Sequence, residues 1–332
     1  MTAGIFRLFA VLSSAAVFTV LPALVSAQET DSGVDDLQLP GITNFAPPRS
    51  EEPLAKQGQG QGVITLSARM TDEGEDISHG LVWRVFGLTQ GADGKLPLIA
   101  SDKGGTTTFH LEPGSYLVHA AFGRAGATKR MSVTADSKSE TLVLDAGGLE
   151  LDAVLSGGKR IPADKLRFSI YDEKADESGD RALIIPDVKP NTVVRLNSGV
   201  YHIVSTYGSV NAIIRSDIRV EAGKLTEASV EHRAAEMTFK LVREAGGEAI
   251  ADTSWSILTE SGDPVREAVG AFASAVLSEG DYIIIAKNRD RIYQRDFSVV
   301  AGQNQDVEVT TADVASETQP TGQPMTANEP LD

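Results

Sequence analysis

The stretch Leu111–Phe122, LEPGSYLVHAAF, decides the fold because its motif returns twice further along the chain. The motif is Leu-x-x-Gly-x-Tyr followed by an apolar run. It recurs in LNSGVYHIVSTY, which starts at Leu196, and in LSEGDYIIIAKN, which starts at Leu277. A glycine that permits unusual backbone angles, followed by a tyrosine that opens a strand, is typical of hairpins. Copies 85 and 81 residues apart indicate an internal repeat.

Strands on either side of this motif keep the same register in all three copies. Each copy has an alternating segment upstream of the motif with one large aromatic residue, which is Trp83, Phe168 or Trp255. Period-two alternation places one face of a strand on a core, so we expect these aromatics to point inward near the motif tyrosine. The expected strands are 63–68, 82–85, 117–122, 131–133 and 141–144 in the first copy, 149–154, 167–170, 202–207, 218–220 and 225–230 in the second, and 237–242, 254–257, 283–286, 297–299 and 307–309 in the third.

The length of the repeat indicates separate domains. Two sheets of such strands packed face to face form a β-sandwich. A repeat of about 80 residues can bury its own core, which favours domains over a solenoid of thin repeats. We therefore predict an all-β protein of three tandem β-sandwich domains. The predicted boundaries are 1–27 for a signal peptide, 28–61 for a disordered leader, 62–145, 146–232 and 233–311 for the three β-sandwich repeats, and 312–332 for a disordered acidic tail.

The motif is most complete in the first copy, as Leu111, Pro113, Gly114 and Tyr116. With the valine-containing strand that follows, it resembles the Ig-like and prealbumin-like modules of extracytoplasmic bacterial proteins, including the CnaB-type and carboxypeptidase regulatory-like groups. The resemblance covers about six residues per repeat, and the proline is confined to the first copy. It implies tandem Ig-like or prealbumin-like sandwiches that act as spacers, stalks or binding platforms.

The resemblance also raises the question of an internal crosslink, since some CnaB-like domains join a lysine to an asparagine or aspartate. Lys240, in the opening strand of the third repeat, would be the donor and Asp306 the acceptor. The other two repeats have no equivalent lysine, which argues against such a crosslink.

The N-terminus has the layout of a secretory signal peptide. Arg7 precedes an apolar stretch from Leu8 to Val20, and the small residues of Val25–Ala27 precede the polar Gln28. This order predicts cleavage before Gln28 and a periplasmic or secreted protein in a cell envelope of the Gram-negative type. The alternative is an uncleaved membrane anchor, because the apolar character continues for about 18 residues.

Charge and cysteine content narrow the classes of partner. The formal net charge of −16 gives a self-repelling surface that is unsuited to nucleic acid or to an anionic bilayer. The absence of cysteine from the sequence excludes disulfides and lipid attachment through an N-terminal cysteine. The fold must therefore be stabilised by burial alone.

The segments outside the repeats have the composition of disordered chain. The leader contains four prolines, several acids and a Gly-Gln run at 58–62, and the tail contains three prolines and few large apolar residues. Neither can bury enough apolar surface to offset the entropy of ordering.

The third repeat contains the best candidate for a binding site. Four basic side chains surround one tyrosine in a segment expected to form a hairpin. In so acidic a chain, a basic patch beside an exposed aromatic ring would suit an anionic sugar or the acidic face of a protein. The alternative is a set of charges that keeps a hairpin tip soluble. The candidate residues are Lys287, Arg289, Arg291, Tyr293 and Arg295.

Metal-binding patterns are weak. None of the five histidines has a ligand spacing typical of zinc. Two acidic segments could supply oxygen ligands to calcium, but neither has the EF-hand order, and solvated loops are the plainer interpretation. These segments contain Asp72, Glu73, Glu75 and Asp76, and then Asp172, Glu173, Asp176, Glu177 and Asp180.

The sequence also lacks a recognisable catalytic motif. It has no Gly-x-Ser-x-Gly elbow, no cysteine nucleophile and no phosphate-binding loop. We therefore predict a non-catalytic exported envelope protein, without cofactor or metal, that binds or scaffolds a periplasmic protein or glycan partner, with no nucleic-acid partner and no membrane span after signal cleavage. One alternative is a hydrolase of envelope glycan or peptide with accessory repeats, which would need converging carboxylates or a Ser–His pair. Another is a membrane-anchored stalk.

Overall fold

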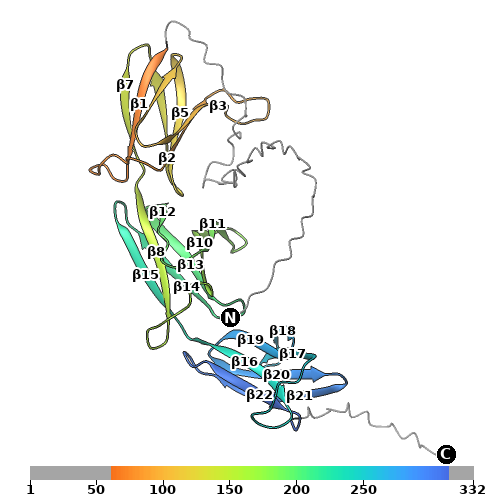
Figure 1. The fold of residues 1–332 in the computed structure, drawn as a ribbon. Coiled ribbons are helices and arrows are strands. Elements are labelled where there is room, and N and C mark those ends of the chain that lie inside the picture. The colour runs from red at the N-terminus through yellow and green to blue at the C-terminus, as the bar shows by residue number, and fades with distance from the viewer. Residues whose placement is uncertain (1–60, 314–332) are drawn as a thin grey trace, which may run out of the picture. The chain divides into compact units, whose positions relative to one another are not determined.

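The computed structural model describes residues 61–313, so the predicted signal peptide, nearly all of the leader and most of the tail lie outside the described residues. Residues 61–313 form 22 strands and no helix (Figure 1). The predicted all-β fold class is therefore confirmed. No segment of this part is a helix long and apolar enough to cross a membrane.

The first and third repeats each form one three-stranded and one four-stranded sheet, and the second forms two four-stranded sheets because the short β9 also pairs with β8. The first sandwich contains β1 (Gly62–Arg69), β2 (Leu81–Gly87), β3 (Leu98–Gly104), β4 (Thr107–Leu111), β5 (Gly114–Phe122), β6 (Ala125–Val133) and β7 (Lys138–Val143). The second contains β8 (Ala146–Leu155), β9 (Lys159–Arg160), β10 (Leu166–Ala175), β11 (Arg181–Val188), β12 (Val194–Asn197), β13 (Gly199–Tyr207), β14 (Ile213–Val220) and β15 (Leu225–His232). The third contains β16 (Ala234–Val242), β17 (Thr253–Thr259), β18 (Pro264–Val269), β19 (Phe272–Ser278), β20 (Gly280–Asn288), β21 (Arg291–Val299) and β22 (Gln305–Thr310).

The sheet topology is the same in all three sandwiches. One sheet of each sandwich has the order β4-β1-β7, β12-β8-β15 or β19-β16-β22, and the other has the order β3-β2-β5-β6, β11-β10-β13-β14 or β18-β17-β20-β21. The added strand β9 is the one departure. In each sheet of the first kind the opening strand pairs with two neighbours and lies parallel to the closing strand. All of the expected strands therefore exist, and the repeat in sequence is a repeat in structure.

Three hydrophobic clusters fill the spaces between paired sheets. The side chains of Trp83, Phe168 and Trp255 are at most 1% exposed, which confirms that they point inward. Each indole also has a polar partner: Trp83 Nε1 donates to the carbonyl of Gly105 at 2.8 Å, and Trp255 Nε1 donates to that of Gly270 at 2.9 Å. The first and third cores thus place a tryptophan in the same way.

The geometry of the motif tyrosine explains the repeated sequence pattern. β5, β13 and β20 each begin at the motif glycine. The tyrosine hydroxyl then donates to the carbonyl four residues upstream: Tyr116 to Glu112 at 2.8 Å, Tyr201 to Asn197 at 2.8 Å and Tyr282 to Ser278 at 2.9 Å. This is the tyrosine corner known from Ig-like sandwiches, which ties a strand to the turn before it. Burial raises the pKa of the Tyr201 hydroxyl to about 12, so this donor keeps its proton at neutral pH.

The edge strands β3, β11 and β18 do not figure among the strands expected from the sequence. They are largely exposed, and the burial of β3 and β11 does not alternate cleanly. An edge strand with both faces exposed to solvent needs no alternating apolar residues, so its hydrophobic periodicity is weak.

The end of each sandwich lies close to the start of the next. β7 ends at Val143 and β8 starts at Ala146, while β15 ends at His232 and β16 starts at Ala234. That each sandwich folds as an independent domain with the predicted boundaries stays a prediction.

The crosslink of the third repeat has no geometry to support it. Asp306 lies opposite Thr238 in the parallel pair of β16 and β22. Lys240 lies opposite Glu308 and forms an ion pair with it at 2.9 Å between Nζ and Oε1. Both side chains are partly exposed, so Lys240 serves as one half of a surface ion pair.

Candidate functional site

The predicted basic segment does form a hairpin, made by β20 and β21. Lys287 lies opposite Ile292 and Asn288 lies opposite Arg291, so Arg289 and Asp290 form the tip. Arg289 has a φ of 54°, a backbone conformation that favours glycine. The side chains of Lys287, Arg289 and Arg291 are exposed.

The five candidate residues do not form one patch, and the exposed aromatic ring was a wrong prediction. Tyr293 is only 4% exposed and belongs to the third core, because it lies opposite the buried Ala286 on the inner face of the sheet. Arg295 uses its guanidinium to donate to the carbonyl of Glu308 in β22. The basic character of the hairpin therefore comes down to Lys287, Arg289 and Arg291.

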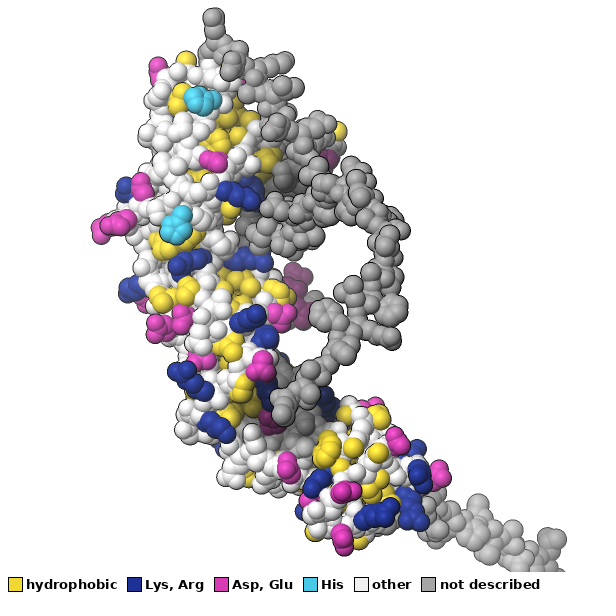
Figure 2. Space-filling view, in the orientation of Figure 1, with side chains coloured by type: hydrophobic (Ala, Val, Ile, Leu, Met, Phe, Trp, Pro, Cys, Tyr) yellow, Lys and Arg dark blue, Asp and Glu magenta, His cyan; other side chains and the backbone are white. Residues whose placement is uncertain are grey.

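Exposed apolar residues at the same end of the third sandwich escaped the sequence reasoning. Val269 is 79% exposed, Phe272 is 60% exposed and Ile292 is 45% exposed. Val269, Ser254, Lys287 and Ile292 lie opposite one another in turn, so they form one row across all four strands of the sheet. We call Val269, Phe272, Ile292 and the tip residues 288–291 the hairpin end of the third sandwich. Figure 2 shows basic and hydrophobic side chains next to one another on the visible face of this sandwich.

The corresponding hairpin tip of the first sandwich contacts the second sandwich. The N–H of Arg124 donates to the carbonyl of Arg195 in β12 at 3.0 Å. The side chain of Asn197 accepts a hydrogen bond from the N–H of Gly126 at 3.2 Å and donates to the carbonyl of Gly126 at 3.1 Å. The guanidinium of Arg195 lies 5.5 Å from the ring centre of Phe122, within cation–π range.

The hairpin tip of the second sandwich contacts the third in the same place. Asn211 donates to the hydroxyl of Tyr282 at 2.8 Å and accepts from the N–H of Ser278 at 3.0 Å. Val276 of β19 belongs to the hydrophobic cluster of the second sandwich, and Val210 packs against that of the third. Apolar and polar contacts therefore cross this junction together.

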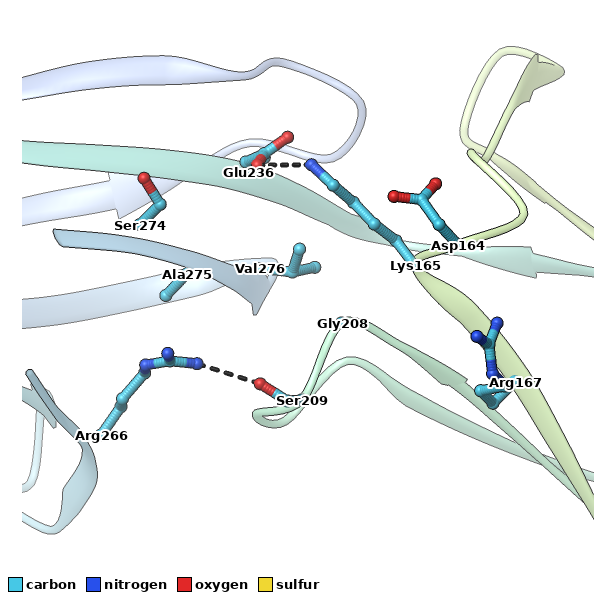
Figure 3. Close-up of a pocket in the computed structure, with 10 residues that line it drawn as sticks. All are labelled: Asp164, Lys165, Arg167, Gly208, Ser209, Glu236, Arg266, Ser274, Ala275 and Val276. Atoms are coloured by element: carbon cyan, nitrogen blue, oxygen red, sulfur yellow. Dashed lines mark hydrogen bonds and ion pairs between the residues drawn. The ribbon is translucent and has the colours of Figure 1, made fainter. Parts of the chain in front are cut away.

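A shallow hollow of about 380 Å³ lies beside this second junction (Figure 3). Its cations already have partners within the protein. Lys165 Nζ donates to Glu236 at 2.6 Å, which raises the pKa of Lys165, and Arg266 donates to the hydroxyl of Ser209 at 3.0 Å. Arg167 donates to two backbone carbonyls nearby. The bonds of Lys165 and Arg266 join the two sandwiches, so the hollow is best understood as the seam between them.

The second core contains a Ser–His pair. The hydroxyl of Ser205 lies 2.8 Å from Nε2 of His232, and both residues are 1% exposed. Burial lowers the pKa of His232 to about 4, so the imidazole is neutral at physiological pH. The equivalent positions of the first sandwich, four residues after the motif tyrosine and at the end of the closing strand, hold Ala120 and Leu144. No substrate can reach a pair sealed inside a core, so this one has the geometry of a buried polar contact.

The other histidines do not cluster into a site. His119 is 3% exposed, and its Nδ1 lies 2.9 Å from the hydroxyl of Thr128, while its Nε2 has no hydrogen-bond partner among the described residues. Burial, followed by the charge of Arg84, lowers the pKa of His119 to about 4. His202 lies 2.7 Å from a carboxylate oxygen of Asp217.

Carboxylates of the acidic loops hold their own loops together. Asp76 forms an ion pair with Arg69 at 2.6 Å. Asp176 accepts from the N–H groups of Ser178 at 2.8 Å and Asp180 at 2.9 Å. Across residues 61–313 no three His, Asp or Glu side chains come together as a metal-binding group would require.

Comparison with known proteins finds one family match. Residues 236–311, which cover most of the third sandwich, match the Rhizobiales growth-associated tandem repeat domain. No curated protein sequence matches the chain.

Similar solved structures are remote. The TIE protein of Bacillus anthracis is 18% identical, with 76% of this chain and 51% of that one covered and a TM-score of 0.22, so this chain spans about half its length. The minor pilin GBS52 of Streptococcus agalactiae is 14% identical, with coverages of 52% and 95% and a TM-score of 0.30. The major pilin subunit BcpA of Bacillus cereus is 12% identical, with coverages of 75% and 99% and a TM-score of 0.20. At such scores we infer nothing about function from these structures.

Proposed function

We propose that this chain is a non-catalytic, exported protein of the cell envelope that serves as a scaffold or binding module in growth. The observation that carries the proposal is the repetition of one unit. The tyrosine corner and the topology recur in all three sandwiches, and the third matches a growth-associated tandem repeat domain. We take the first two sandwiches to be further copies of that repeat.

The described side chains favour binding over catalysis. A hydrolase needs a nucleophile or paired carboxylates in a cleft that substrate can enter. The Ser205–His232 pair is enclosed by the second core, and the cations that line the hollow of Figure 3 already bond to Glu236, to the Ser209 hydroxyl or to backbone carbonyls. Repeated sandwiches joined by short connections are instead suited to presenting surfaces at set distances from each other.

The surface that we assign to partner binding is the hairpin end of the third sandwich. It combines the basic side chains of Lys287, Arg289 and Arg291 with the exposed Val269 and Phe272. A desolvated apolar centre with basic side chains at its rim is a common composition of protein interfaces.

Photo-crosslinking in living cells tests this assignment. A photoreactive amino acid at position 292 should capture an envelope component, and the double variant R289E/R291E should lose it. The matched control is K159E/R160E, an exposed basic pair in β9 of the second sandwich. Capture that the first variant leaves unchanged would remove the hairpin end from the proposal.

Two further measurements test the export and the chemistry. Mass spectrometry of the N-terminus should find a chain that begins at Gln28. A chain that retains residues 1–27 would indicate the anchored stalk instead. A fluorophosphonate probe for activated serines should not label Ser205, and labelling lost in S205A would favour the hydrolase.

A further inference from the structure

The hairpin end of the third sandwich is equivalent to the two hairpin tips that dock within the chain. The seventh residue after each motif tyrosine is Gly123, Gly208 or Arg289. All three have positive φ, at 65°, 73° and 54°. Each is the first residue of its hairpin tip, which has two residues in the first and third sandwiches and four in the second.

The docked tips meet the same residue of the following sandwich. An ideal Cβ built on Gly123 would lie 2.9 Å from Cβ of Arg195, and one built on Gly208 would lie 2.6 Å from Cβ of Val276. Arg195 and Val276 each precede the motif leucine. In the first sandwich the residue at this position is His110, which is exposed on the edge strand β4. Within the described residues, the third sandwich thus has a tip without a docking strand and the first has a docking strand without a tip.

We propose that these two ends meet between molecules, so that the hairpin end of the third sandwich of one copy docks on residues 110–112 of the first sandwich of a second copy. The proposal extends a contact that the chain already makes twice. It does not depend on where the protein is located, but it uses the surface that we assign to partner binding, so an envelope partner would compete with a second copy.

Charge supports this pairing. The residue that follows the motif leucine is Asn197 in the second sandwich and Ser278 in the third. In the first sandwich it is the exposed Glu112. Asn197 accepts the N–H of Gly126, and the residue equivalent to Gly126 in the third sandwich is Ile292. The Glu112 carboxylate can accept that N–H next to the guanidinium groups of the hairpin.

Apolar surface supports it as well. In each sandwich one residue of the edge strand β3, β11 or β18 pairs with the inward aromatic of the neighbouring strand. The next residue along that edge strand is Lys103 in the first sandwich, Lys189 in the second and Val269 in the third. The end that no sandwich of the described residues covers is therefore the end with the exposed valine. The acidic side chains of Asp290 and Asp252 lie near the tip, so shape and apolar contact must contribute alongside charge.

Arg289 sets the strength of the contact. Its Cβ occupies the space that Gly123 and Gly208 leave open for the next sandwich. The contact between copies must therefore be wider and weaker than the internal junctions, and so reversible. Because it joins two different surfaces, it continues head to tail unless the ring closes.

Cysteine pairing tests the geometry directly, since the natural chain contains no cysteine. Chains beginning at Gln28 are made with R289C or with H110C and mixed under mild oxidation. We expect a disulfide-linked dimer from the mixture, because a contact about 1 Å wider than the internal Cβ separations of 2.9 Å and 2.6 Å reaches the roughly 3.5–4.5 Å that a disulfide needs. The matched control pairs R289C with D72C, an exposed position in the loop after β1. Equal yields from both mixtures, or no dimer from the first, would overturn the proposal.

Sedimentation equilibrium tests the chemistry without a covalent trap. The variants E112R and R291E should each weaken self-association by about tenfold, and the chain that carries both should recover it because the charges are exchanged. Both residues are exposed, so folding should be unaffected, and circular dichroism checks this. A chain that stays monomeric at millimolar concentration refutes the inference, whereas the proposed binding role fails if position 292 captures no envelope component other than this chain in cells.

Discussion

The first and third sandwiches share a core and differ at their ends. Both place a tryptophan between the sheets and bond its indole to the carbonyl of a glycine, and both close a tyrosine corner. Their hairpin tips differ. Gly123 of the first lies against the second sandwich, whereas Arg289 of the third stands at the same point of the turn with no following sandwich in the described chain.

This difference shows that the core and the ends of the repeat have separate roles. The core fixes the strands, and every copy does so with inward aromatics and the tyrosine corner. The ends decide what the copy contacts, and the first tip residue differs between the docked and the open ends. A glycine permits close docking, and a larger side chain in its place leaves a looser end.

The largest expected effect tests the shared core. Replacing Trp83 or Trp255 by alanine should destabilise the affected sandwich by roughly 3–5 kcal/mol, through the cavity left and the loss of the indole bond. Urea unfolding followed by circular dichroism measures it. Tryptophan to phenylalanine is the control, because the second sandwich holds Phe168 at this position, and it should cost much less. Unequal losses for W83A and W255A would mean that the two cores are not equivalent.

The next effect tests the docked tip. G208R places the side chain of the third tip in the second junction, where its Cβ would meet Cβ of Val276 at 2.6 Å. The overlap and the positive φ together should cost roughly 2–3 kcal/mol. We expect thermal unfolding at a lower temperature and faster hydrogen exchange at residues 208–212 and 274–278.

The reverse variant R289G is the control for G208R. It relieves the positive φ at a tip that meets no sandwich of its own chain, so stability should be unchanged or slightly higher. If R289G destabilises the third sandwich as much as G208R destabilises the second junction, the two tips do not differ as described.

A third effect, of about 2 kcal/mol, separates the sandwiches by pH. Burial lowers the pKa of His119 to about 4, against 6.5 when unfolded, and the third sandwich contains no histidine. Because the unfolded chain takes up the proton first, the stability of the first sandwich is fully present above pH 6.5. As the pH falls from 6.5 toward 4, the free energy of unfolding of the first sandwich decreases, by about 2 kcal/mol at pH 5.

Single-tryptophan variants make this pH effect visible. In W255F the fluorescence of Trp83 reports on the first sandwich, and in W83F that of Trp255 reports on the third. Urea midpoints measured at pH 7 and pH 5 should fall for Trp83 and stay nearly constant for Trp255. The second sandwich should follow the first because burial also lowers the pKa of His232 to about 4.

The sequence predicted the features that depend on the repeated motif and on the alternation of apolar residues along strands. The motif around Tyr116 and the inward Trp83 could be predicted because they depend on local spacing and on burial of one strand face. The exposure of Tyr293 was predicted wrongly, because the charges beside it suggested an exposed hairpin. Alternation along β21 places Tyr293 on the inner face, opposite Ala286. The alternation of inward and outward residues could have shown that Tyr293 is buried, provided that the turn is placed at Arg289 and Asp290.

The candidate site depended on relations between distant residues. That Gly123 and Gly208 meet Arg195 and Val276 follows from how one sandwich reaches the next, which no spacing along the chain encodes. Val269 is likewise exposed at an end that no sandwich of residues 61–313 covers. Only a comparison of the same position in three copies reveals these features, and it requires the register that the structure supplies.

The smallest expected effect compares a tyrosine corner at a junction with one at an open end. The hydroxyl of Tyr282 donates to the Ser278 carbonyl at 2.9 Å, lies 2.9 Å from the Ser278 hydroxyl and accepts from Asn211 at 2.8 Å across the junction. That of Tyr116 donates to the Glu112 carbonyl alone among the contacts described. Y116F should therefore cost about 0.5–1 kcal/mol and Y282F about 1–2 kcal/mol, because the second variant also removes the hydroxyl that the Asn211 amide and the Ser278 hydroxyl contact. The cost of Y282F is then measured in S278A and in N211A/S278A, and the difference between these two costs is the share of the bond to Asn211. Equal losses for Y116F and Y282F in the natural background would show that the bond to Asn211 adds no stability, and the docked and open ends would then differ only in the backbone approach at Gly208.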